Sequence, residues 1–125
     1  MPIIEQIEDA IQVHCAWADR LKAAIEAGAS DLTPDVVGRD EACPFGRWLL
    51  GDGIPESAKR LHSYDHAIEV HRDFHRHAGE ALALALAGER DEAVRRLDNT
   101  SPFTMASVML TLTLRAWQID LAEAA

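Results

Sequence analysis

Hydrophobic residues recur at helical spacing in three long segments of the chain, and no segment has the strict alternation of a strand. The pattern predicts long helices over residues 3–27, 55–87 and 102–123. Gly28 and Gly88 stand where the first two should stop, and Ser101 followed by Pro102 is a capping sequence for the last.

Two short helices complete the expected pattern. Pro44 suits the first position of one of them, with Cys43 as its N-cap and Gly51 and Gly53 at its end. The other is expected over about residues 90–97.

Between these helices, residues 28–42 are rich in Gly, Asp, Ser and Pro and are expected to be irregular. Ala and Leu dominate a chain that is 48% hydrophobic and 26% charged, a composition that favours helices. We therefore predict a single all-α domain over residues 1–125. Its expected fold is an antiparallel four-helix-bundle-like arrangement of three long and two short helices.

The net charge of −9 argues against nucleic acid or an anionic membrane as partner, because both bind cationic surfaces. No apolar run approaches the roughly 20 residues of a membrane span, and the acidic N-terminal sequence is unlike a basic signal peptide. A cytoplasmic location is expected. In that reducing compartment the two cysteines are not expected to form a structural disulfide.

The long helix expected over residues 55–87 carries five histidines, which helical geometry divides between two faces. At about 100° per residue, His71 and His75 fall in the apolar arc of the helix. His62, His66 and His77 fall among charged residues on the other side. We therefore expect His71 and His75 to point into the core and the other three to be solvated.

His14 lies in the middle of the apolar stripe of the first helix, together with Ile7, Leu21 and Ile25. A buried imidazole needs partners for two nitrogens, and three core histidines are hard to satisfy with the few core acceptors of this sequence. A shared metal ion would satisfy all three at once, and the i, i+4 spacing of two of them suits chelation of zinc.

Cys43 is the expected fourth ligand, since a thiolate at the start of a short helix is favoured by the helix dipole and by free backbone N–H groups. One thiolate and three imidazoles would form a closed tetrahedral zinc site. Cys15 is the rival candidate, but its helical angle points beside the core, which suits a small packing residue.

Three spaced blocks of the sequence resemble the bacterial chemoreceptor zinc-binding (CZB) domain family. They are HCAW at residues 14–17, CPFGRW at 43–48 and HRDFH at 71–75. They match that family's His-x-x-Trp, Cys-x-hydrophobic-Gly-x-aromatic and His-x3-His pattern. The intervals of 29 and 28 residues between the first residues of the blocks also agree with the family.

The resemblance implies that His14, Cys43, His71 and His75 bind one Zn²⁺ per chain. It also implies that Trp17, Gly46 and Trp48 shape the site. For these three the alternative interpretation is packing alone, as core aromatics and a point of close approach.

Members of this family usually accompany chemoreceptors or enzymes that make cyclic di-GMP, and they sense zinc or, through the zinc-bound cysteine, oxidants such as hypochlorous acid. The resemblance therefore implies a regulatory zinc-binding domain, not an enzyme, in which Cys43 is redox-sensitive. With 125 residues and no room for a signalling domain, a stand-alone member that signals to a separate partner is expected.

A homodimer is also expected, because the last helix has two apolar faces and the family resemblance favours a second copy. The alternative is a last helix sandwiched within one monomer. Two other functions remain open: a zinc-stabilised interaction module or zinc buffer, and a hemerythrin-like di-iron oxygen-binding protein. The di-iron site is disfavoured because no Asp or Glu shares the apolar arcs of the three histidines.

Overall fold

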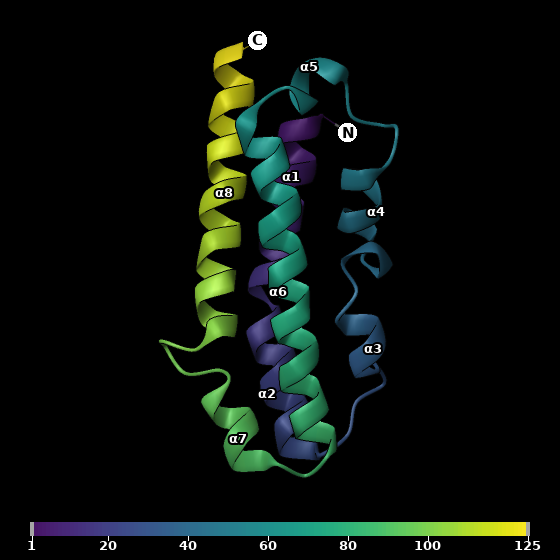
Figure 1. The fold of residues 1–125 in the computed structure, drawn as a ribbon, viewed down its shortest axis with the longest axis vertical. Coiled ribbons are helices and arrows are strands. Elements are labelled where there is room, and N and C mark those ends of the chain that lie inside the picture. Colours follow the sequence, from purple (N-terminus) through teal and green to yellow (C-terminus); the bar gives the residue numbers. More distant parts are fainter. Residues whose placement is uncertain (1, 125) are drawn as a thin grey trace.

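The computed structural model describes residues 2–124, and within them every regular element is helical, which confirms the all-α class. Figure 1 shows the chain running along α1 and α2, returning through α3 and α4, and then running along α6 and back along α8. The bounds are α1 Ile3–Cys15, α2 Trp17–Ala27, α3 Pro34–Val37, η1 Asp40–Ala42, α4 Pro44–Leu50, α5 Glu56–Lys59, α6 His62–Leu86, α7 Arg90–Arg95 and α8 Pro102–Ala124.

The expected count of three long and two short helices is wrong, because two of the predicted long helices are interrupted. The first breaks at Ala16, whose N–H donates to the carbonyl of Val13, three residues back. The helix over 55–87 breaks at Leu61, whose backbone is extended. Neither break contains Pro or Gly, so no local signal marks it.

The break at Ala16 leaves α1 and α2 with a common buried face. This face contains Ile7, Ala10, Ile11 and His14 from α1, and Trp17, Leu21, Ala24 and Ile25 from α2. His14 therefore lies inside the apolar stripe, as its spacing predicts. Gly28 ends α2 with φ 66, a left-handed conformation that glycine adopts without steric cost.

The segment expected to be irregular contains two short helices. Thr33 caps α3 by accepting a hydrogen bond from the Val36 N–H, and Pro34 occupies the first helical position. A single 3-10 turn, η1, follows and leads into Cys43. These two elements pack against α6, so the segment forms a wall of the domain and brings Cys43 to the core.

The last helix begins where Ser101 and Pro102 predict, with the Ser101 Oγ accepting a hydrogen bond from the Thr104 N–H. One side of α8 packs against α6, and Leu114 and Trp117 on that side are fully buried. The opposite side exposes large apolar residues, namely Met105, Val108, Met109, Leu112 and Ile119. Within one chain, therefore, α8 is not sandwiched.

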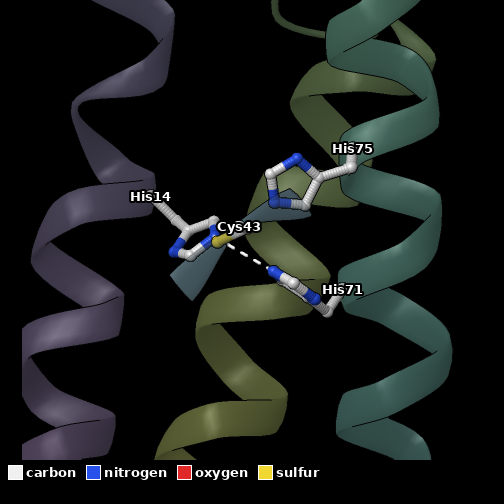
Figure 2. A group of neighbouring side chains, drawn as sticks. All are labelled: His14, Cys43, His71 and His75. Carbon is white, nitrogen blue, oxygen red and sulfur yellow. Dashed lines mark hydrogen bonds between the residues drawn. The ribbon is translucent and has the colours of Figure 1, made fainter. Parts of the chain in front are cut away.

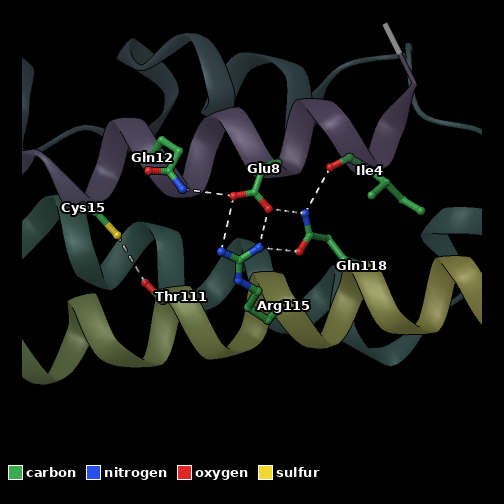
Figure 3. Close-up of polar contacts among 7 residues, drawn as sticks. All are labelled: Ile4, Glu8, Gln12, Cys15, Thr111, Arg115 and Gln118. Carbon is green, nitrogen blue, oxygen red and sulfur yellow. Dashed lines mark hydrogen bonds and ion pairs between the residues drawn. The ribbon is translucent and has the colours of Figure 1, made fainter.

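A polar cluster ties α1 to α8 (Figure 3). Glu8 on α1 accepts hydrogen bonds from both Nη atoms of Arg115 and from Gln12 and Gln118. Gln118 also donates to the carbonyl of Ile4. These contacts fix the register of α1 on α8, and hence the height of His14 along the bundle. Among residues 2–124, no helix combines the length and apolarity that crossing a bilayer requires.

Candidate metal centre

One thiol and three imidazoles meet inside the bundle, and they come from three separate elements. His14 lies on α1, His71 and His75 lie one turn apart on α6, and Cys43 is the residue before α4. One ligand atom from each lies within 4.8 Å of those of the others. Figure 2 shows the four side chains directed toward one another. The structure thus brings together the four residues predicted as ligands.

Backbone carbonyls orient two of the imidazoles. His14 Nδ1 lies 2.7 Å from the carbonyl oxygen of Ala10, and His75 Nδ1 lies 2.9 Å from that of Val37. A carbonyl can only accept, so both Nδ1 atoms carry the proton and both Nε2 atoms present a lone pair. This arrangement, with the second nitrogen held by a carbonyl, is usual for histidines that bind metals.

Two of the distances among the ligand atoms match those of a tetrahedral zinc ion. His14 Nε2 lies 3.2 Å from His71 Nε2 and 3.7 Å from Cys43 Sγ. Zn–N bonds of about 2.0–2.1 Å and Zn–S bonds of about 2.3 Å place two nitrogens about 3.3 Å apart, and nitrogen and sulfur about 3.6 Å apart. His14, His71 and Cys43 thus present two atom pairs at the spacing of zinc ligands, and the four ligand atoms together lie within 4.8 Å of one another.

Three buried side-chain nitrogens are unsatisfied among the described residues; one is Trp117 Nε1 in the core, and the other two belong to the site. His75 Nε2 and His71 Nδ1 have no hydrogen-bond partner. An unpaired buried polar atom costs roughly 1–3 kcal/mol, so such atoms call for an explanation. A metal ion would satisfy His75 Nε2 directly. The set of three nitrogens and one sulfur is one that zinc favours.

Burial keeps the three imidazoles neutral, the form that binds metal. Desolvation lowers the pKa of His14 to about 4 and that of His71 to about 2. It also lowers the pKa of His75, against the raising effects of the Val37 hydrogen bond and of Asp40 and Glu41. At neutral pH no proton has to leave an imidazole before a metal binds.

Cys43 is positioned by the turn that precedes α4. Its N–H donates to the carbonyl of Asp40 at 3.2 Å, and its own carbonyl accepts from Arg47 in the first turn of the helix. Its thiol is half-buried and makes no capping hydrogen bond. The side chain is therefore free to turn inward toward His14.

Gly46 permits the close approach of α4 to this turn. A Cβ at this position would lie 1.8 Å from the carbonyl oxygen of Asp40 and 3.1 Å from Cε1 of His71. Only glycine fits such a contact, so Gly46 shapes the site by its lack of a side chain. Gly46 is therefore the point of close approach that the sequence predicts, and it lies directly against the imidazole of His71.

The two predicted tryptophans lie beside the site and not in it. Trp17 is buried, with its ring centroid 6.3 Å from that of His75. The guanidinium of Arg20 lies over the Trp17 ring, 4.0 Å from the ring centroid. Trp48 is half-buried and packs against Trp117. Trp17 thus contacts a predicted ligand imidazole, and Trp48 contacts a buried aromatic ring of the core.

The remaining candidates lie outside the site. Cys15 is exposed, with its Sγ 3.9 Å from the Thr111 hydroxyl, so its predicted role as a packing residue is wrong. Of the three histidines predicted to be solvated, only His62 is exposed. His66 and His77 are half-buried, because they lie at the edge of the α6–α8 contact.

Several groups that build the site cannot be recognised in the sequence, because the type of residue does not matter there. The carbonyls of Ala10 and Val37 are examples, since any residue would supply them. Gly79 offers a faint signal, as a glycine in the middle of a long helix. A Cβ there would lie 2.8 Å from the Cα of Gly38, so the glycine lets α3 reach α6 and brings the Val37 carbonyl to His75.

Comparison with known proteins identifies a family. The family model of the chemoreceptor zinc-binding domain matches residues 14–82, a span that contains all four residues of the metal centre. No curated protein and no solved structure matches the chain.

Proposed function

Since the chain belongs to the chemoreceptor zinc-binding domain family, we propose that it binds one Zn²⁺ through His14, Cys43, His71 and His75 and serves as a regulatory sensor. The observation that carries the proposal is the meeting of one thiol and three neutral imidazoles, whose ligand atoms lie within 4.8 Å of one another. Four protein ligands leave no position for water, so we propose no catalytic role.

Cys43 is the ligand through which the site would respond. When bound, zinc supplies a cross-link between α1, α6 and the turn before α4. Oxidation of Cys43 to a sulfenate or higher oxide removes the best donor of the set, and loss of zinc has a related effect. Either change frees the segment from α3 to α4. We propose that this segment reports zinc occupancy or thiol oxidation, by oxidants such as hypochlorous acid, to a partner.

Metal analysis of the purified protein tests the ligand set. We expect one zinc per chain in the wild type, less in Cys43→Ser and His71→Ala, and wild-type content in Cys15→Ser. The last variant is a matched control, because it makes the same substitution at the exposed thiol. Full zinc retention by Cys43→Ser would contradict the assignment.

Hydrogen exchange separates a sensor from a site that only stabilises the fold. A sensor predicts that removal of zinc, or mild oxidation, speeds exchange in residues 30–55 while residues 102–124 on the far side change little. A structural module or zinc buffer predicts no such local response to oxidants. The hemerythrin-like alternative has little support, since the group of candidate ligands among residues 2–124 contains no carboxylate. We expect a colourless protein.

We also propose that the exposed side of α8 pairs with a second copy of the chain. The large apolar residues on this side, with Leu112 59% and Ile119 57% exposed, form one surface along the helix. Such a patch on a single chain usually marks an interface. Leu112→Glu should convert a dimer to a monomer in light scattering, whereas Val94→Glu on α7 should not. A chemoreceptor or a cyclic di-GMP enzyme is the proposed signalling partner.

A further inference from the structure

A pocket between α1 and α4 leads from solvent to the metal centre. His14 and Cys43 form part of its wall, so it reaches the ligand that the proposed function makes redox-sensitive. We call it the α1–α4 pocket; its other lining residues include Gln6, Asp9, Val13, Pro44, Phe45 and Trp48. Its volume is about 360 Å³.

The size and walls of the pocket favour an organic molecule over a small inorganic one. A water molecule occupies about 30 Å³ of liquid, so the pocket has room for roughly ten of them, far more than a peroxide of two oxygen atoms needs. Val13, Pro44, Phe45 and Trp48 supply apolar surface. A bound molecule gains free energy from contact with these apolar walls by burying its own hydrocarbon surface.

The charges around the pocket favour an uncharged molecule. Asp9 is exposed at its rim, and no Lys or Arg is among the lining residues. The whole chain carries a net charge of −9, which adds to the repulsion of anions. An anionic oxidant would therefore be at a disadvantage at this entrance.

We propose that the α1–α4 pocket binds a small uncharged organic hydroperoxide and delivers it to Cys43, an inference that rests on the redox sensing proposed above. The thiolate of Cys43 attacks the outer peroxide oxygen, an S–O bond forms, and the O–O bond breaks. The alkoxide leaves and takes a proton from water to become the alcohol. The sulfur is oxidised by two electrons to the sulfenic acid, and the peroxide is reduced by two.

The test compares tert-butyl hydroperoxide with hydrogen peroxide on the zinc-loaded protein. Thiol loss is followed separately at Cys43 and at Cys15 by mass spectrometry of alkylated peptides, and zinc release is followed with a chromogenic chelator. The exposed Cys15 serves as a reference thiol inside the same molecule. The measured quantity is the Cys43 to Cys15 rate ratio with the organic peroxide, divided by the same ratio with hydrogen peroxide.

We expect this selectivity to be about tenfold or more, because burying even two carbons of the tert-butyl group contributes that factor. Val13→Phe should fill the pocket from a position that is 55% exposed and bring the selectivity close to one without changing zinc content. Val94→Phe, at a 51% exposed position on α7, should leave it unchanged.

A wild-type selectivity near one, or a selectivity that Val13→Phe leaves intact, would overturn the inference about the pocket. If Cys43 reacts with both peroxides and releases zinc, the proposed sensor survives that result. If Cys43 reacts with neither peroxide, or reacts without releasing zinc, the redox part of the proposed function fails together with the inference.

Discussion

Replacing Gly46 with alanine should damage both the fold and the metal centre. The new Cβ would lie 1.8 Å from the carbonyl oxygen of Asp40. Ordinary carbon–oxygen contacts begin near 3.3 Å, so α4 and the turn before it must separate by about 1.5 Å. The obstacle is backbone on both sides, and no side-chain rotation can relieve it.

The same displacement reaches the thiol, because the Asp40 carbonyl also accepts the hydrogen bond of the Cys43 N–H. Metal–ligand distances tolerate only about 0.2 Å of error. We therefore expect the zinc affinity of Gly46→Ala to fall at least about tenfold, the lower end of the effect of losing a residue that orients a ligand. Overpacking typically costs about 1–3 kcal/mol, and a backbone clash belongs at the upper end.

For 125 residues, 3 kcal/mol corresponds to a fall in Tm of roughly 11 °C. Thermal unfolding of the apoprotein and competition titration with a zinc chelator measure the two effects. Gly53→Ala is the matched control, since a Cβ there meets nothing nearer than the Trp48 ring at 4.0 Å. If Gly46→Ala and Gly53→Ala show equal Tm and equal zinc affinity, the clash argument is refuted.

Three further perturbations have expected outcomes. Between pH 7 and 5 the apoprotein should lose roughly 2 kcal/mol of unfolding free energy for each of His14 and His71. The reason is that these side chains take up protons below pH 6.5 in the unfolded chain, whereas burial lowers their pKa values in the folded protein to about 4 and about 2. Urea titrations at both pH values check this. Arg115→Ala should raise the pKa of Glu8 from about 2, since the lost hydrogen bond is the largest cause of its lowering, as an NMR pH titration would show. Tyr64→Phe should cost about 1–3 kcal/mol in urea unfolding, because its hydroxyl donates to the Leu49 carbonyl at 2.6 Å and that buried acceptor would lose its partner.

Helical periodicity identified the residues of the metal centre because each ligand differs in type from its neighbours. His14, His71 and His75 are polar residues inside apolar arcs, and Cys43 precedes a helix that a proline opens. Burial of all three imidazoles agrees with that reasoning. The chemistry of a site is visible in a sequence when the residues that perform it violate the local pattern.

The interruptions of the long helices were not visible in this way. Ala16 and Leu61 lie in stretches with good helix formers, and packing against the rest of the domain decides their backbone conformation. The walls of the site also depend on distant pairs, such as Gly38 with Gly79, whose meeting is a property of the folded chain. A local pattern contains no information about which residues a segment will meet.

The wide spacing of the ligands along the chain has a consequence for folding kinetics. His14 and Cys43 are 43 − 14 = 29 residues apart, and Cys43 and His71 are 71 − 43 = 28 apart. Closing each such loop in the unfolded chain costs about 3 kcal/mol of entropy. We therefore expect zinc to meet a complete site only after α1, α4 and α6 have assembled. The ion should then slow unfolding, which lengthens the lifetime of the folded protein, and leave the folding rate nearly unchanged.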